Sequence, residues 1–143
     1  MIDHVWTVLC SRSVIDIETN NVSIQDVIEQ LNIPGEPKPD GFLAIPFELI
    51  SLWSRSDPEN PEHGTERIIF ITPSGKSTVV AEPKINLSEA ERHRNRVKFP
   101  GLPIAEEGQH YFQIEYMVDK GKWKKVASLP LSIVFDHKPV PTP

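Results

Sequence analysis

The sequence predicts an all-β fold, a single antiparallel β-sandwich of about eight strands, immunoglobulin-like or similar. Most apolar stretches alternate with period two, which is the spacing that places side chains on opposite faces of a strand. Short groups of turn-forming residues separate these stretches, and no long helical pattern is present. The chain also has 14 prolines among its 143 residues, about twice the usual share of roughly 5 %. Several prolines lie between apolar stretches, which suits strands and loops better than helices.

The first strand is predicted in the sequence HVWTVLC. Trp6, Val8 and Cys10 fall on one face of this strand, and Val5 and Leu9 fall on the other. Apolar residues on both faces favour a central strand. We therefore expect Trp6 in the core and Cys10 as a small, unreactive buried residue.

Residues 22–32, VSIQDVIEQLN, fit either a helix or a strand. Four apolar residues have helical spacing: Ile24, Val27, Ile28 and Leu31. Ser23 followed by Asp26 resembles a helix capping box. In favour of a strand, Asn20-Asn21 suits a tight hairpin turn, because asparagine tolerates positive φ. A bulge near Asp26 would then absorb the change of alternation. The local pattern leaves both structures open.

The remaining strands follow the same alternation. The stretch GFLAIPFELISLW contains Pro46, which removes a ladder donor, so we expect this strand at a sheet edge or with a bulge. ERIIFITPSGKSTVVA is a hairpin around a Pro-Ser-Gly turn, and HYFQIEYMV and WKKVASLPLSIVF form another around DKGK. The sandwich domain is therefore expected to cover residues 1–135. The Pro-rich tail, residues 136–143, lacks apolar residues for packing and is expected to extend.

Three stretches resemble a family of small uncharacterised bacterial proteins: VLCSRSVIDIETNNVSIQDVIEQLNI, NRVKFPGLPIAEEGQHYFQIEYM and WKKVASLPLSIVF. The resemblance covers nearly the whole chain. It implies a β-sandwich in which the segment like VSIQDVIEQL is the second arm of a hairpin. It implies no activity. On this resemblance we predict a strand over residues 22–32.

Composition and charge predict a cytoplasmic protein. Cys10 is the only cysteine, so no intramolecular disulfide can form. The N-terminal sequence lacks the basic region and apolar run of a signal peptide, and no apolar stretch approaches the roughly 20 residues that span a bilayer. The net charge of −5 repels phosphate, so we expect neither a membrane nor a nucleic acid as partner.

Motifs for catalysis and metal binding are incomplete. Gly75-Lys76-Ser77 resembles the end of a phosphate-binding loop, but Phe70 stands where that motif needs a glycine. The sequence has no Gly-x-Ser-x-Gly elbow, and its five histidines have no metal-ligand spacing. We therefore expect no enzyme, no catalytic residue, no cofactor and no metal. Trp53 is expected in the core, and Trp123, among lysines, is expected at the surface.

The stretch ERHRNRVKF has the most unusual charge pattern. If it is extended, Arg92, Arg94, Arg96 and Lys98 project from one face, and we call these four residues the basic ridge. Four like charges in a row repel each other unless something compensates. One interpretation is a solvated face balanced by acidic residues of a neighbouring strand. The candidates for that role are Glu107, Glu115 and Asp119.

The other interpretation is a surface that binds an anion or an acidic partner, because the arginine fork suits phosphate and carboxylate groups. Two functions follow. The leading hypothesis is a non-catalytic protein-interaction or scaffold module that contacts another protein, or a second copy, through exposed sheet edges and the tail. The alternative is an anion-ligand-binding module that uses the basic ridge, residues 92–98.

Overall fold

The computed structural model describes residues 1–118 and 120–136, which form twelve strands and no helix. The all-β prediction is therefore confirmed. The strands are β1 (Ile2–Ile15), β2 (Val22–Val27), β3 (Gln30–Pro34), β4 (Phe42–Leu43), β5 (Phe47–Arg55), β6 (Glu62–Ile71), β7 (Ser77–Ala81), β8 (Lys84–Leu87), β9 (Arg92–Phe99), β10 (Leu102–Pro103), β11 (Gly108–Val118) and β12 (Lys124–Asp136). The count exceeds eight partly because two predicted strands are interrupted, one at residues 28–29 and one at residues 44–46.

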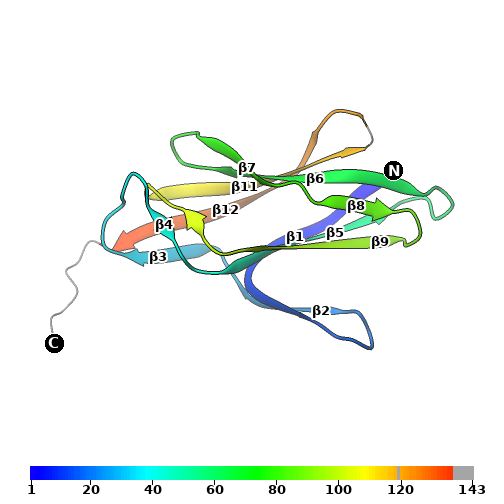
Figure 1. Ribbon diagram of the computed structural model, residues 1–143, viewed down its shortest axis with the longest axis horizontal. Coiled ribbons are helices and arrows are strands. Elements are labelled where there is room, and N and C mark those ends of the chain that lie inside the picture. The colour runs from blue at the N-terminus through cyan, green and yellow to red at the C-terminus, as the bar shows by residue number, and fades with distance from the viewer. Residues whose placement is uncertain (119, 137–143) are drawn as a thin grey trace.

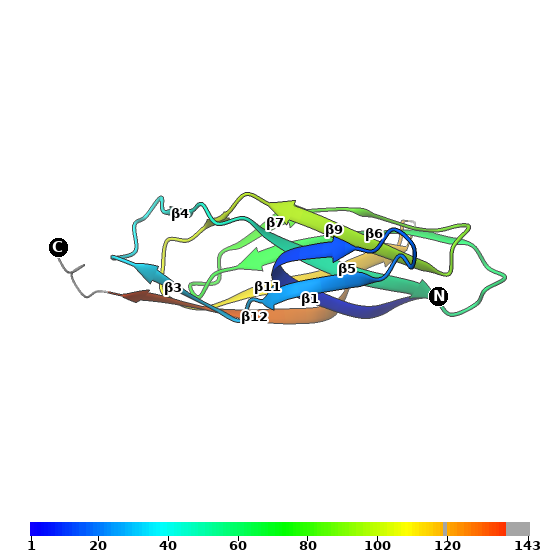
Figure 2. The same cartoon turned by 90° about the horizontal axis from the view of Figure 1, so that it is seen from below.

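The strands form two large sheets and one small one. The first sheet has the order β2-β1-β5-β9, and the second has the order β3-β12-β11-β6-β7, with β8 also paired to β6. A two-stranded sheet joins β4 and β10. All pairs are antiparallel except β3 with β12, which is parallel. Figures 1 and 2 show an elongated molecule, and Figure 1 shows strands of the two large sheets in separate layers.

One hydrophobic core lies between the two large sheets. Its buried residues come from both: Leu9, Phe47, Leu49 and Trp53 from the first, and Ile68, Phe70, Phe112, Ile114, Leu131 and Ile133 from the second. The rings of Phe47 and Phe112 meet across the layers with centroids 6.0 Å apart. These contacts keep the first sheet fixed against the second, and so they fix the position of β9.

Residues 22–32, whose sequence fits both a helix and a strand, are extended and pass from the first sheet to the second. β2 pairs with β1 in the first sheet, and β3 pairs with β12 in the second. At the crossing, the Ile28 amide donates to the Leu9 carbonyl over 2.8 Å, and the Glu29 carbonyl accepts from the Ser132 amide over 3.0 Å. The strand prediction is thus confirmed on both sides of a break. Asn20, in the preceding turn, has the expected positive φ of 60°.

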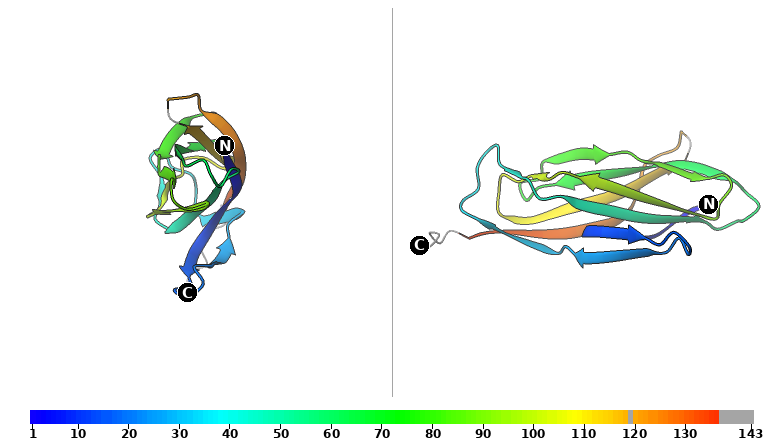
Figure 3. Two further views of the ribbon diagram at one scale, coloured as in Figure 1. Left: turned by 90° about the vertical axis from the view of Figure 1, so that its right-hand side faces the viewer. Right: turned by 60° about the horizontal axis from the view of Figure 1, so that its bottom comes forward.

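The hairpin made by β1 and β2 folds back over the outer face of the first sheet. β1 pairs with β5 from Ile2 to Cys10 and with β2 from Cys10 to Ile15, so its two halves have different partner strands within the first sheet. Figures 2 and 3 show the second half of β1 turning back alongside the first sheet. Ile50 faces away from the core and is nevertheless fully buried, because this β1–β2 hairpin (residues 10–27) covers it.

Two sequence predictions for single residues are wrong. β5 begins at Phe47, directly after Pro46, and lies between β1 and β9. It is neither an edge strand nor bulged at the proline, because a proline outside the strand removes no ladder donor. Trp6 lies outside the core cluster, because the register between β1 and β5 shifts between His4 and Trp6 and turns the indole to the outer face. Trp53 is in the core, as predicted.

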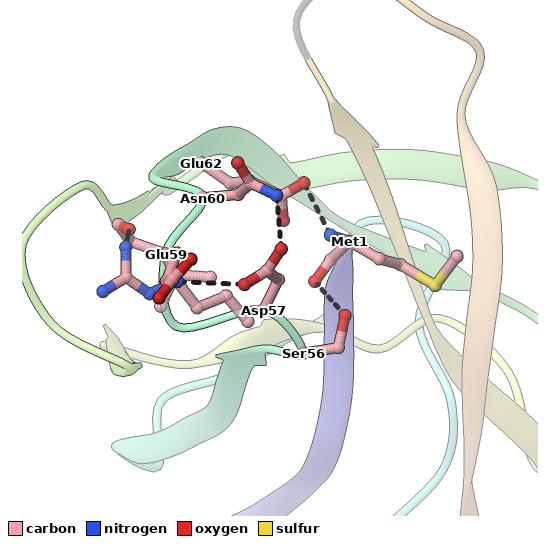
Figure 4. A network of polar contacts seen from close by, with 8 residues as sticks. Met1, Ser56, Asp57, Glu59, Asn60 and Glu62 are labelled. Atoms are coloured by element: carbon pink, nitrogen blue, oxygen red, sulfur yellow. Dashed lines mark hydrogen bonds and ion pairs between the residues drawn. The ribbon is translucent and has the colours of Figure 1, made fainter.

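The two ends of the fold are held by backbone and polar contacts. β12 continues to Asp136, whose carbonyl accepts from the Gly35 amide over 3.0 Å, one residue beyond the expected domain boundary. The rest of the predicted tail, 137–143, lies outside the described residues. At the other end, Figure 4 shows the polar loop between β5 and β6, where Ser56 Oγ donates to the Met1 carbonyl and the Met1 ammonium lies 2.7 Å from Glu62 Oε1.

Candidate functional site

The basic ridge lies on β9, the edge strand of the first sheet. Arg92, Arg94, Arg96 and Lys98 project on the outer face, while His93, Asn95, Val97 and Phe99 alternate with them and point inward. The prediction that the four cations share one face is confirmed. The structure divides them into two pairs with different surroundings.

Arg96 and Lys98 share one carboxylate of the adjacent strand. Arg96 Nε and Lys98 Nζ each lie 3.9 Å from Glu48 Oε1. Glu48 is buried and stands directly opposite Lys98 in the pairing of β5 with β9. This half of the ridge therefore has one carboxylate for two cations, and Arg96 Nη1 also donates to Ser13 Oγ of the hairpin over 3.3 Å.

The acidic residues expected to balance the ridge have other partners. Glu115 forms a 2.6 Å ion pair with Arg67, and Glu107 accepts a hydrogen bond from the Phe135 amide over 2.7 Å. Asp119 lies outside the described residues. The prediction failed for Glu107 and Glu115 because β9 pairs with β5 and not with β11, a choice that the strand patterns leave open.

Arg92 and Arg94 face a cavity of about 370 Å³. The cavity lies between the outer face of the first sheet and the tip of the β1–β2 hairpin. It is lined by Trp6, Leu52, Arg92 and Arg94 from the sheet and by Thr19, Asn20, Asn21 and Val22 from the hairpin. No acidic side chain is among the described residues that line it. The cavity is therefore cationic, although the whole chain carries a net charge of −5.

Arg94 connects the sheet to the hairpin tip. Its Nη2 donates to the Asn20 carbonyl over 2.6 Å, which fixes the tip above the cavity. Its Nε is buried and has no hydrogen-bond partner within residues 1–118 and 120–136. Buried donors in proteins are usually paired, so this unpaired N–H is an exception within the part of the chain that the structure describes.

A second polar cluster lies inside the core and was not found from the sequence. Glu66 of β6 is fully buried and accepts hydrogen bonds from three side chains of the first sheet: Ser51 Oγ at 2.6 Å, Trp53 Nε1 at 3.1 Å and Asn95 Nδ2 at 2.9 Å. The signal in the sequence was the alternation of Glu66 with Ile68 and Phe70, which places the carboxylate on the inward face. Because Glu66 and Ser51 have no exposed surface, this cluster joins the two sheets and offers no open binding site.

The other residues singled out by the sequence have structural surroundings. Cys10 is fully buried, and burial together with the Glu48 carboxylate raises the pKa of its thiol. Lys76 lies in the exposed turn between β6 and β7, as the hairpin prediction required. Trp123 is half-buried, with the Arg67 guanidinium 4.0 Å from its ring centroid.

Neither a metal-binding group nor a membrane-crossing helix occurs in the part of the chain that the structure describes. No three His, Cys, Asp or Glu residues come together there in a way that could hold a metal ion. No helix there has the length and apolarity that crossing a bilayer requires.

The chain matches no family model and no curated protein sequence. Solved structures similar to it include a family 123 glycoside hydrolase from Clostridium perfringens, with a TM-score of 0.47 and 9 % identity over 80 % of this chain and 24 % of that one. A second is the alkylpurine DNA glycosylase AlkC of Pseudomonas fluorescens, with a TM-score of 0.44 and 9 % identity over 90 % of this chain and 30 % of that one. A third is an LPMO from Kitasatospora papulosa, with a TM-score of 0.36 and 10 % identity over 78 % of this chain and 52 % of that one.

These comparisons correct the prediction that the protein is not an enzyme, because the structures similar to it are those of enzymes. They transfer no activity and no substrate, since the TM-scores lie below 0.5 and the identities do not exceed 10 %. The chain spans between about a quarter and a half of the length of these three solved chains.

Proposed function

We propose that this chain binds a small anionic ligand in the cavity under the β1–β2 hairpin, with Arg92 and Arg94 as the recognition residues. We further propose that the two large sheets form a β-sandwich that serves as the rigid support for this site. The observation that carries the proposal is that Arg92 and Arg94 both line the cavity, with no acidic side chain among the described residues of that lining. An anion in the cavity would accept hydrogen bonds from these two guanidinium groups.

The division of the basic ridge supports the same function. Glu48 lies near Arg96 and Lys98, while no carboxylate of the described residues lines the cavity at Arg92 and Arg94. A pair of guanidinium groups has the planar, multiple-donor geometry that suits carboxylate and phosphate oxygens. The cavity volume falls within the range of roughly 300–1,000 Å³ that is usual for sites of small molecules.

The test is a titration with acetate and, separately, inorganic phosphate, followed by NMR of the arginine side-chain N–H groups. Wild type is compared with Arg92→Gln and with the matched control Lys98→Gln, which removes the same charge from the other half of the ridge. A hydrogen bond to a charged group contributes about 1.5–3 kcal/mol, so Arg92→Gln should weaken binding roughly 10- to 150-fold. Lys98→Gln should weaken it only slightly. Equal effects of the two substitutions would mean that the anion senses the general field of the ridge and not the cavity.

A second candidate function is self-association through open sheet edges, which is the interaction module expected from the sequence. β12 pairs with β3 only from Ser132 to Asp136, so its stretch 124–131 has no partner strand on that side within the described residues. Residues 2–8 of β1 likewise pair with β5 alone among the described strands. Such edges present backbone donors and acceptors to a strand of a second copy. Sedimentation velocity over a hundredfold range of concentration tests this candidate, and a monomer throughout would contradict it.

A further inference from the structure

We propose that the ligand of this cavity is an aromatic carboxylate whose ring stacks on Trp6 while its carboxylate binds Arg94 and Arg92. This inference rests on the proposed function and specifies its ligand. It follows from the order of the side chains across the floor of the cavity.

The floor of the cavity is a row of three side chains on neighbouring strands. Trp6 of β1 is paired with Leu52 of β5, and Leu52 is paired with Arg94 of β9. Residues paired across strands have side chains on the same face. The row therefore changes from aromatic to aliphatic to cationic over two strand spacings, roughly 10 Å from backbone to backbone.

Trp6 is available for this role because of the irregularity in β1. The register shift between His4 and Trp6 places His4 and Thr7 toward the core, where the His4 and Trp53 rings lie 5.1 Å apart. The Trp6 indole is left on the outer face, half-buried and facing the cavity. A large aromatic surface beside a cavity favours a flat apolar partner, because aromatic rings gain from stacking beyond the burial of their area.

Arg94 and Arg92, at the cationic end of the row, determine the acidic group of the ligand. Arg94 Nε is the buried donor without a partner among the described residues, and Arg92 borders the cavity two residues away on the same face of β9. One planar carboxylate can accept from Arg94 and Arg92 together. A ligand that satisfies both ends of the row has a ring and a carboxylate joined by a short spacer.

The hairpin tip closes the cavity from above with polar groups. Thr19, Asn20 and Asn21 line it, and the Asn20 carbonyl is held by Arg94. These groups accommodate the solvated edge of a ligand, whereas the apolar contact comes from the sheet. A bare inorganic anion would use the arginine end alone and would leave the indole without a function.

The test compares four probes on the folded wild-type chain: 3-phenylpropionate, cyclohexanepropionate, propionate and inorganic phosphate. NMR titration gives each affinity. We expect 3-phenylpropionate to bind at least about tenfold more tightly than propionate and roughly 2- to 10-fold more tightly than cyclohexanepropionate, because stacking adds to apolar burial. Equal affinity for the three carboxylates overturns the aromatic assignment while the anion site stands. Tighter binding of phosphate than of every carboxylate overturns the carboxylate assignment.

Substitution of the indole tests the same inference independently. Trp6→Thr should remove the preference for 3-phenylpropionate over propionate while the affinity for propionate stays within about twofold, and Trp6→Phe should retain the preference. Trp123→Thr, which changes a tryptophan far from the cavity lining, is the matched control. If Trp6→Thr does not fold, the affinity ratios of the wild type decide. If no carboxylate or phosphate binds and Arg92→Gln changes nothing, the proposed function itself fails and not only its aromatic form.

Discussion

The buried carboxylate of Glu66 should be essential to the stability of the protein, and the substitution Glu66→Met tests this. Glu66 accepts from Ser51, Trp53 and Asn95, all of which belong to the first sheet. Methionine fills a similar volume without an acceptor oxygen, so packing is retained and the hydrogen bonds are lost. The Ser51 hydroxyl can turn to Thr7 Oγ1, which lies 3.0 Å away.

The two remaining donors, Trp53 Nε1–H and Asn95 Nδ2–H, stay buried without an acceptor. Each such group costs about 1–3 kcal/mol, so the free energy of unfolding should fall by roughly 2–6 kcal/mol. Domains of this kind are stable by about 5–15 kcal/mol, so the variant should be close to unfolding. Urea unfolding followed by far-UV circular dichroism measures the change, and an unchanged slope with denaturant confirms that both proteins unfold in the same way.

Glu66→Gln is the matched control. Its side-chain oxygen can accept from Trp53 and Asn95 while its amide donates to Ser51 Oγ, so we expect a loss of about 1–2 kcal/mol or less. The reasoning is refuted if Glu66→Met is as stable as Glu66→Gln, because the cost is assigned to the orphaned donors and not to the loss of charge.

Three further predictions concern other parts of the fold. Burial lowers the pKa of His110, and the Gly108 carbonyl and Glu106 oppose this effect only in part. Below about pH 6.5 the unfolded chain therefore binds a proton at this histidine that the folded chain does not bind. The free energy of unfolding should therefore fall as the pH drops from 7 toward 5, and this slope should be smaller in His110→Phe; an identical slope would contradict it. Cys10 should react with a maleimide only as fast as the native state opens, since its thiol is buried and its pKa is raised; rapid labelling that is independent of urea would show otherwise. In Gly101→Ala the new Cβ would lie 2.2 Å from the Leu43 carbonyl oxygen, so β4 and β10 must separate. We expect the free energy of unfolding, measured by thermal unfolding, to fall by about 1–3 kcal/mol. An unchanged free energy would mean that the contact relaxes freely.

The alternation of apolar residues was sufficient to predict the all-β class and the two long hairpins, because each of those strands keeps one face toward one core. It failed to decide between helix and strand in residues 22–32. Val22 and Ile24 are half-buried without being part of the main core, whereas Ile28 and Leu31 pack against that core. A strand that changes sheets changes the face it buries, and the resulting spacing imitates a helix.

The candidate site was predictable only in part. The period of two placed Arg92 and Arg94 on one face, and β9 confirms it. The cavity beside them depends on two long-range features, the fold of the β1–β2 hairpin over the first sheet and the register shift that turns Trp6 outward. Neither feature leaves a pattern in the local sequence. The fold of the hairpin depends on which strands pair, and the register shift depends on where β1 accommodates one extra residue.

The way in which the hairpin is attached has a consequence for entry and release. The hydrogen bonds that hold it to the basic ridge come from the side chains of Arg94 and Arg96. These side-chain hydrogen bonds can break while the pairing of β1 with β5 stays intact. The β1–β2 hairpin can then move away from the first sheet without any strand leaving the core. Exchange of a ligand in the proposed cavity would then require only these side-chain contacts to open, because β1, at fourteen residues, keeps the hairpin joined to the first sheet.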